Sequence, residues 1–394
     1  MAARTGIRGV GVALLLVVAL ASCGTSVSPT TPAGAPAGEL VCASCARASG
    51  VGPLHLPRRT AAVHVVLAGD VLLHNGLWAT AANDARKDGR PAGVLDFGPL
   101  FGPVHRLVAG ADLAVCHLET PLAPPGGPFS GYPLFAVPPR IAGGLRQAGF
   151  DVCTTASNHS LDQGQSGVRR TLRALDRQGI AHTGTARTPT EQRRPELVEV
   201  QGILVAVLSY TYGTNGLVAT PGTEWSVNLA DPARIRADAR RAKERGADVV
   251  LVALHWGNEY RHEPSAAQLE LARAVTRSRH VDLVYGHHAH VVQPVRRING
   301  TWVIFGLGNL VAQQDPAIVG VYEGIVAQVD LVRRPSGRVA ARYVGYRPTY
   351  ISRFSSSDPA TRVIDIERAL RRGTFPALRG ELVAARDRIA AIMQ

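Results

Sequence analysis

The stretch VDLVYGHHAHVVQP, residues 281–294, places three histidines at the end of an apolar run. A neutral histidine inside a core, or a histidine-rich surface loop, would be a purely structural explanation. Imidazoles presented at a strand end are also common ligands of transition metals. Alternation along an extended chain puts His288 and His290 on one face and His287 on the other. We therefore expect His288 and His290 to bind metal, and His287 to support them from behind by packing or hydrogen bonding.

Other apolar runs also end in polar side chains. Asp70, Glu119, the pair Asn158 and His159, and His255 each stand where a run of buried-type residues stops. The carboxyl ends of strands in an α/β sheet are where such folds build ligand sites. An isolated buried polar group costs free energy unless it is paired, so packing alone explains this series poorly. The combination of carboxylate, amide and imidazole predicts a shared site for Zn, Mn or Fe.

The elements that must position these residues alternate between strands and helices. Apolar runs predict strands, and segments with apolar residues at helical spacing predict helices between them. This alternation is typical of an α/β fold with a largely parallel or mixed sheet covered by helices. Strands are expected over 64–73, 112–119, 150–159, 203–213, 248–257 and 281–288, later strands around a Pro-Ser-Gly turn at 335–337, and helices over 166–179, 231–247, 264–279, 359–373 and 377–393.

Between Val63 and Val311 the chain resembles the CapA family of poly-γ-glutamate capsule biosynthesis proteins, a branch of the calcineurin-like metallophosphoesterase superfamily. The resemblance implies a four-layer αββα sandwich over residues 61–350, with residues 351–394 as a helical extension packed on it. The stretches that carry it are LAGDVLLH, AVCHLETPL, TASNHSLDQGQSGVRRTLRALDRQGIAHTG, LHWGNEYRHEPSAAQLELARAV, VDLVYGHHAHVVQPV and VIFGLGNLV.

The resemblance also implies a ligand set at the strand ends. It implies two divalent ions (Mn, Fe or Zn), or one held tightly, because Leu72 stands where the superfamily has the histidine of Asp-x-His. His74 could approach only if the strand has already ended. His159 matches the residue that stabilises the transition state, and Asp162 is a candidate to orient it. The metal ligands implied are Asp70, Glu119, Asn158, His255, His288 and His290.

Arg261 and His262, just after the HWGNEY stretch, could meet an anionic substrate. Glu259, Tyr260 and Arg261 are candidates to line the pocket, and a solvated loop is the alternative. The leading functional hypothesis is a metal-dependent hydrolase acting on phosphoesters or γ-glutamyl polymer bonds. The second is a non-catalytic accessory protein that binds or exports an anionic polymer, within a capsule synthase complex. A solute-binding lipoprotein would not explain the ligand series.

The first residues predict where the protein resides. Arg4 and Arg8 precede an apolar stretch too short for a membrane span, which is typical of a signal peptide over residues 1–22. It ends in Leu-Ala-Ser-Cys, which resembles a lipobox with Cys23 as the diacylated residue; a plain secreted protein is the alternative. Residues 23–60 are rich in Pro, Gly, Ser and Thr and predict a tether. We expect a lipoprotein on the extracellular face of the cytoplasmic membrane.

Charge and cysteines narrow the partners. The formal net charge of +13 suits anionic cell-wall polymers or lipid headgroups. We expect no nucleic-acid partner, because no basic run is interleaved with aromatic residues. Cys42 and Cys45 form a single C-x-x-C, for which a local disulfide is expected in an oxidising compartment. Cys116 and Cys153 lie in apolar runs and are expected to be buried thiols.

Overall fold

The computed structural model describes residues 62–357 and 359–394. The expectations for the signal peptide, Cys23, the tether and the Cys42–Cys45 pair lie outside these residues. Among the helices that are described, none is both long enough and apolar enough to cross a membrane.

The first sheet has eight strands and contains the predicted N-terminal strands. Its order is β14-β13-β12-β1-β2-β3-β4, and β11 pairs with β1. The strands β1 to β4 run parallel, whereas β12, β13 and β14 are joined antiparallel to β1 and to each other. The bounds are β1 (Val63–Val71), β2 (Leu113–Leu118), β3 (Val152–Thr154), β4 (Ala181–Thr183), β11 (Asn309–Val311), β12 (Glu323–Arg333), β13 (Val339–Ile351) and β14 (Val363–Asp365).

The second sheet has six strands in the order β5-β6-β7-β8-β10-β9. Its central strands β6, β7, β8 and β10 are parallel, and the edge strands β5 and β9 are antiparallel to their neighbours. The bounds are β5 (Glu196–Val200), β6 (Ile203–Thr211), β7 (Val249–His255), β8 (Leu283–His287), β9 (Val292–Ile298) and β10 (Thr301–Leu307).

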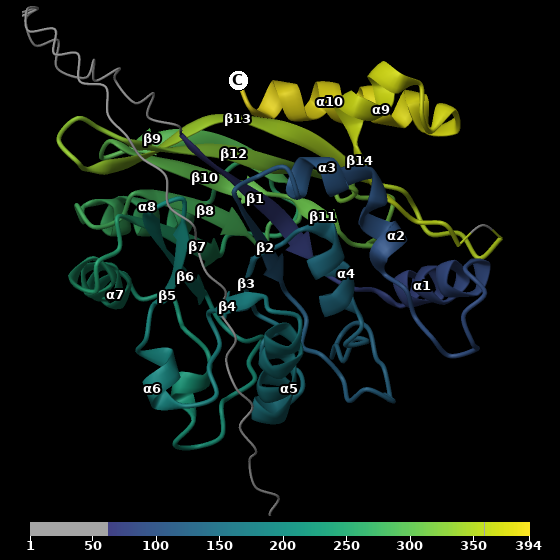
Figure 1. The fold of residues 1–394 in the computed structure, drawn as a ribbon, viewed down its shortest axis with the longest axis horizontal. Coiled ribbons are helices and arrows are strands. Elements are labelled where there is room, and N and C mark those ends of the chain that lie inside the picture. Colours follow the sequence, from purple (N-terminus) through teal and green to yellow (C-terminus); the bar gives the residue numbers. More distant parts are fainter. Residues whose placement is uncertain (1–61, 358) are drawn as a thin grey trace, which may run out of the picture. The chain divides into compact units, whose positions relative to one another are not determined.

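Helices connect the parallel strands (Figure 1). Their starts follow local sequence signals: Asp231 accepts a hydrogen bond from the Arg234 main-chain nitrogen at the start of α7, and Ser265 with Gln268 forms a capping box at the start of α8. The bounds are α1 (Asn75–Lys87), α2 (Gly98–Phe101), α3 (His105–Val108), α4 (Ile141–Ala148), α5 (Gly164–Arg177), α6 (Pro189–Gln192), α7 (Pro232–Glu244), α8 (Ala266–Thr276), α9 (Ile366–Arg372) and α10 (Arg379–Ile392).

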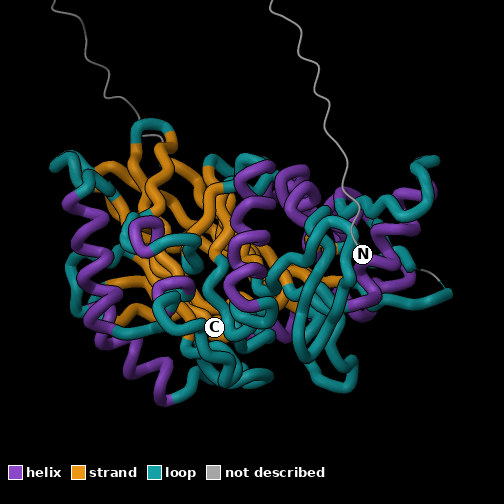
Figure 2. Tube along the Cα trace, turned by 90° about the horizontal axis from the view of Figure 1, so that it is seen from below, coloured by secondary structure: helices purple, strands orange, loops and turns teal. Residues whose placement is uncertain are grey.

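The two faces of strand β6 show how the layers are built. Val205 and Val207 belong to the large core cluster that holds residues of both sheets. Ala206 and Leu208, which alternate with them, belong to a separate cluster with α7 and α8. Both faces of the strand are therefore apolar, as expected for a parallel strand covered on two sides. In Figure 2 the strands (orange) lie between helices (purple). The predicted α/β sandwich fold is confirmed.

Most expected elements are present, with differences at their ends. The strand expected over 150–159 stops at Thr154, so the chain has left the sheet before Asn158. The helix expected over 359–373 begins only at Ile366, because residues Val363–Asp365 first form β14 against β13. The strands β4, β5 and β9 were not predicted. All three are short or lie at a sheet edge, where apolar patterning is weak.

The expectation of free thiols at Cys116 and Cys153 is wrong. The two residues lie directly opposite each other on β2 and β3, with 4.6 Å between their Cα atoms, and they form a disulfide. The register of two parallel strands separated by a helix decides this pairing. Composition alone indicated only that both residues are buried.

Candidate metal centre

The carboxyl ends of both sheets meet at one place. In the first sheet Asp70 is the register partner of His117, and in the second sheet His255 is the partner of His287. All four side chains are completely or almost completely buried. Each sheet thus delivers a neighbouring pair of metal-ligand side chains to the same point, as the strand-end series predicted.

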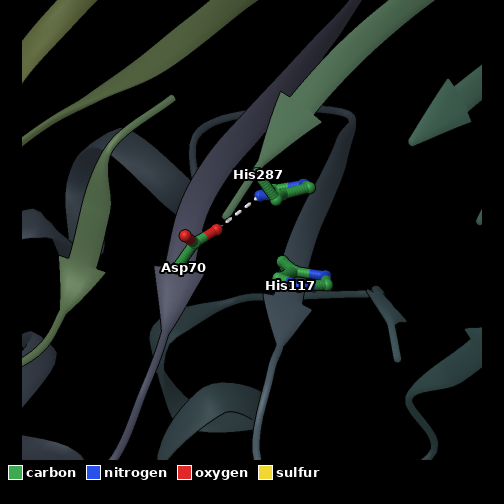
Figure 3. Close-up of side chains that lie close together, drawn as sticks. All are labelled: Asp70, His117 and His287. Carbon is green, nitrogen blue, oxygen red and sulfur yellow. Dashed lines mark hydrogen bonds and ion pairs between the residues drawn. The ribbon is translucent and has the colours of Figure 1, made fainter. Parts of the chain in front are cut away.

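Two contacts join these pairs across the sheets. His287 Nδ1 lies 2.7 Å from Asp70 Oδ1, and His117 Nε2 lies 3.0 Å from His255 Nδ1. The rings of His117 and His287 are stacked with their centroids 4.0 Å apart. Figure 3 shows His287 reaching Asp70 with His117 beneath it.

Close backbone approach holds Asp70 in place. A Cβ atom added to Gly69 would lie 2.1 Å from the Gly308 carbonyl oxygen, so only glycine fits at position 69. This close approach allows the Asp70 main-chain nitrogen to donate to Gly308 O at 3.0 Å. The hydrogen bond fixes the end of β1 where the first carboxylate of the site begins.

Glu119 has the environment that most clearly indicates a bound cation. Its carboxylate is buried, and neither oxygen has a hydrogen-bond partner among the residues that the structure describes. Burial raises the pKa of Glu119 well above its usual value. The neighbouring groups are His255 Nε2 at 3.8 Å and His290 Nε2 at 3.7 Å, both imidazole nitrogens. An unpartnered buried carboxylate among imidazoles is costly in isolation, and a metal ion would satisfy it.

Asp70 behaves differently from Glu119. Burial acts to raise its pKa, but hydrogen bonds from His287 and His290 outweigh this and hold the pKa of Asp70 well below its usual value. Burial acts to lower the pKa of His290, but the neighbouring carboxylates of Glu119 and Asp70 outweigh this effect and raise the pKa to about 9. Asp70 is therefore a carboxylate held in its ionised form, as a metal ligand must be.

His288 and His290 reach the site by a different backbone path from the one expected. Strand β8 ends at His287, and both later histidines have positive φ angles, 83° for His288 and 57° for His290. The alternation of an extended chain therefore does not apply to them, and that part of the prediction is wrong. Such conformations cost about 1–3 kcal/mol each in residues other than glycine and gather at functional sites.

Both rings nevertheless join the cluster. The His288 ring lies 4.7 Å from the His255 ring, and its buried Nδ1 has no hydrogen-bond partner in the described part of the chain. Burial lowers the pKa of His288 to about 3, which keeps the imidazole neutral and able to bind metal. His290 Nδ1 lies 3.2 Å from Asp70 Oδ2 and 3.0 Å from Asn309 Oδ1. The His287 side chain, expected to support His288 and His290, is directed toward Asp70 instead.

The amide expected in the ligand set lies beside His255. Asn158 Oδ1 lies 2.8 Å from His255 Nε2, and Asn158 Nδ2 donates to Asn215 Oδ1 at 3.2 Å. The structure therefore brings all six residues of the predicted ligand set into one connected cluster. Within it, three groups have ligand atoms within 4.8 Å of one another: Asp70 with His117 and His287, Asp70 with Glu119 and His290, and Glu259 with His288 and His290.

The predicted catalytic pair is formed in the turn after β3. His159 Nδ1 lies 2.8 Å from Asp162 Oδ2, and the same carboxylate oxygen accepts from the Phe135 main-chain nitrogen at 2.8 Å. Ser157, in the same turn, donates from Oγ to the Glu119 carbonyl at 2.6 Å. Asp162 therefore fixes the orientation of the His159 ring and leaves its Nε2 to face other groups.

Two of the three candidate substrate residues lie near the histidine cluster, and the third is on the surface. Glu259 lies with His288 and His290, and the Tyr260 ring is 6.1 Å from the His290 ring. Tyr260 has φ 62°, and its main-chain nitrogen donates to Ala289 O at 2.8 Å. Arg261 is exposed, and its carbonyl accepts from Gln293. In the described chain the contacts that join the site residues do not include the Arg261 side chain.

Three residues near the cluster were missed by reasoning from the sequence. His117 could have been found, because it lies two positions before Glu119 and shares its face of the strand. Tyr212 follows β6, is half exposed, and has its ring 4.7 Å from the ring of His288. Asn309 is tied to His290 by its side chain, and only the fold brings these two together.

His74 stands beside the cluster rather than in it. Strand β1 ends at Val71, so His74 is free to turn inward, and its Nδ1 accepts from the Gln313 main-chain nitrogen at 3.1 Å. Burial lowers the pKa of His74 to about 4. None of the three close ligand groups within the described residues includes it.

Known proteins similar to this chain include proteins of bacterial capsule synthesis. Residues 64–314 match the model of the family described as bacterial capsule synthesis protein PGA_cap. The PGA biosynthesis protein CapA of Bacillus subtilis is 33% identical over 172 residues, which cover 43% of this chain and 44% of that protein. The capsule biosynthesis protein CapA of Bacillus anthracis is 28% identical over 246 residues, covering 62% and 58%. The chain thus spans about half the length of these curated relatives.

Among solved structures, the calcineurin-like phosphoesterase YfkN from Bacillus subtilis aligns with 81% of this chain and 99% of its own. The TM-score is 0.39 at 16% identity. The family resemblance expected from the sequence is confirmed by the family model, which covers most of the described residues. The chain belongs to the bacterial capsule synthesis protein family PGA_cap.

Proposed function

We propose that this protein is a metal-dependent hydrolase that acts on an anionic cell-envelope polymer, during its synthesis, export or processing. The bond attacked is a phosphoester or a γ-glutamyl-type bond of that polymer. The observation that carries the proposal is Glu119: a buried carboxylate without a partner, surrounded by the imidazoles of His255 and His290 and close to Asp70.

The residues present fit divalent metal. Asp70, Glu119, Asn158, His255, His288 and His290 would hold one or two ions, and His117 and His287 add further imidazole nitrogens. Mn, Fe and Zn are the candidates for this mixture of oxygen and nitrogen ligands. When bound, such ions activate water for attack and stabilise negative charge on the substrate.

The protein's own residues would carry the remaining chemistry. His159, held by Asp162 through Nδ1, can transfer a proton from Nε2 to the leaving group or stabilise charge that develops there. Tyr212 covers His288 and His255 with its ring, which limits the access of water on that side. His287 and Asn309 orient Asp70 and His290, respectively.

The family membership and the relatives' names support an anionic polymer as the substrate. The two Bacillus relatives are named for PGA and capsule biosynthesis. The positive net charge of the chain is compatible with a polymer of this kind. A capsule synthase complex is the partner we propose on the same basis.

The test is hydrolysis by the purified full chain. Bis-p-nitrophenyl phosphate and γ-linked oligoglutamate should be tried with and without added Mn, Zn or Fe. We expect turnover of at least one substrate, lost after chelation and restored by metal. Bound metal without turnover of either substrate would instead support the non-catalytic accessory role. A relative from Mycobacterium tuberculosis is named a probable polyglutamine synthesis accessory protein, which keeps that alternative open.

We further propose that the protein works outside the cell, attached to the extracellular face of the cytoplasmic membrane through a lipid on Cys23. The support is the sequence pattern of residues 1–23, an apolar stretch followed by Leu-Ala-Ser-Cys.

A further inference from the structure

A cavity lies near the turn after β3 that holds His159 and Asp162. It has a volume of about 510 Å³ and is lined by His74, Asn75, Gly76, Tyr132, Gln313, Pro316, Tyr322, Arg353 and Phe354. We call it the Arg353 cavity.

Aromatic side chains connect the Arg353 cavity to the metal centre. The ring of His74, in the cavity wall, lies 5.7 Å from the ring of Phe135. The ring of Phe135 in turn lies 4.8 Å from that of His159. Tyr132, also in the wall, has its ring 6.4 Å from Phe135. The cavity and the proposed proton donor therefore lie on either side of one phenylalanine, near enough for one extended substrate to reach both.

The charge in this cavity is positive. Arg353 is exposed, and its guanidinium lies 5.4 Å over the Tyr322 ring, which restrains its direction. No carboxylate within the described residues forms an ion pair with it, and the described residues lining the cavity include no Asp or Glu. Asp315, in the adjoining loop, turns one oxygen to the Ala317 main-chain nitrogen at 2.9 Å.

Helix α1 adds to this charge. It begins at Asn75 in the cavity wall, has no acidic residue in its first turn, and receives no side-chain cap from His74. The free N–H groups and dipole of a helix N-terminus favour an anion. The Asn75 amide and the exposed Tyr132 hydroxyl supply further hydrogen-bonding groups beside the guanidinium.

We infer that the Arg353 cavity is a substrate subsite that binds a carboxylate of an acidic polyamide chain while a neighbouring bond of the chain lies at the metal centre. The guanidinium binds the carboxylate, and the Asn75 amide and Tyr132 hydroxyl pair with the amide groups between carboxylates. This inference rests on the proposed function for its choice of substrate. Phosphate polymers offer the guanidinium an anion and Asn75 Nδ2 an acceptor, but they offer Asn75 Oδ1 no N–H donor, whereas a polyamide chain offers all three.

The test measures binding rather than turnover, so it does not depend on the hydrolase proposal. A fluorescently labelled γ-linked oligoglutamate is titrated with the full chain at low ionic strength. Arg353→Gln should weaken binding about tenfold, because it removes a charge-assisted hydrogen bond. Arg353→Lys should restore part of the loss. Arg338→Gln, an exposed arginine on the β12–β13 hairpin, is the matched control and should bind like the wild type.

Asn75→Asp guards against a folding artefact. It places a negative charge in the cavity and should weaken oligoglutamate binding. An acidic residue in the first turn of α1 should at the same time leave the melting temperature unchanged or raise it. Metal content should be unchanged in the Arg353 and Asn75 variants, because neither residue belongs to the close ligand groups within the described residues.

Three outcomes would overturn the inference. The first is equal oligoglutamate affinity in wild type and Arg353→Gln. The second is an equal loss in Arg338→Gln, which would mean that only overall charge matters. The third comes from a parallel titration with polyphosphate: if Arg353→Gln loses polyphosphate binding while it keeps oligoglutamate binding, the cavity is a phosphate site. If the subsite holds while no substrate is hydrolysed, the hydrolase proposal fails alone.

Discussion

His287 Nδ1 lies 2.7 Å from Asp70 Oδ1, although 217 residues separate the two in the chain. His287 ends β8 in the second sheet and Asp70 lies near the end of β1 in the first. This contact joins the two sheets at their carboxyl ends and keeps Asp70 ionised. The candidate metal centre and the packing of the sheets therefore share residues, so a change in one should alter the other.

Replacing each of the three histidines of GHHAH by alanine should have a different effect on metal content and stability. His288→Ala should strip metal strongly, because it removes a buried imidazole with a free nitrogen. His290→Ala should weaken metal binding less or act mainly on rate. His287→Ala should lower the melting temperature more than the metal content, because it removes the partner of Asp70 and a ring stacked on His117.

Metal content by mass spectrometry and melting temperature should be compared for the three variants side by side. Loss of metal from His287→Ala with retention in His288→Ala would reverse the assignment. His287 Nε2, which has no hydrogen-bond partner among the described residues, would then be the ligand atom.

The catalytic turn can be tested separately from metal binding. His159→Asn should lower turnover of bis-p-nitrophenyl phosphate by about 10²- to 10⁴-fold, the usual contribution of a positioned acid or base. Asp162→Asn should give a smaller loss, because the amide keeps an acceptor oxygen for the His159 ring and loses only the negative charge beside it. Metal content should stay at the wild-type level in both. A parallel loss of metal would place His159 among the ligands instead.

The disulfide predicts a measurable loss of stability. Cys116 and Cys153 close a loop with a sequence separation of 37 residues. A loop of that size contributes about 4 kcal/mol in the chain-entropy account. The double variant Cys116→Ala with Cys153→Ala should have a clearly lower urea midpoint of unfolding than wild type. Adding a reducing agent such as dithiothreitol should lower the wild-type midpoint and bring the two midpoints closer together. Cys42→Ser with Cys45→Ser is the control and should leave both stability and metal content nearly unchanged. Equal stability of the two double variants would mean that the buried pair is not bonded.

The fold was largely predictable because its central strands are apolar on both faces and its longer helices place apolar residues at helical spacing, with clear N-terminal caps on α7 and α8. Asp70, Glu119 and His255 could be placed at strand ends from the sequence alone, since each directly follows such a run. The cross-strand register that pairs Cys116 with Cys153 could not be predicted, because nothing local sets it.

The turn after β8 could not be predicted either. His288 and His290 adopt left-handed conformations that their residue types do not favour, and tertiary contacts hold them there. The hydrogen bond that Asn309 Oδ1 accepts from His290 Nδ1 likewise depends on the packing of β10 and β11 beside the candidate metal centre.

Attachment to the membrane can be tested at Cys23. Cys23→Ala should move the protein from the membrane fraction to the soluble or secreted fraction, or leave an unprocessed precursor. The reason is that stable anchoring needs the two acyl chains that this cysteine would carry. Fractionation and mass spectrometry of the mature N-terminus provide the measurement. Mature protein that stays fully membrane-bound in the variant would contradict the lipoprotein assignment.

Glu119→Gln tests the central claim most directly, with metal content and melting temperature measured with and without chelator. Wild type should bind one or two divalent ions and gain stability from them. The variant should lose most of the metal, while its chelated form melts at the same temperature as chelated wild type or higher, because glutamine removes a buried carboxyl that has no partner among the described residues and can be ionised only at a cost. Wild type without metal after growth with Mn, Fe and Zn, or a variant that retains the wild-type metal content, would contradict the assignment of this cluster as a metal centre.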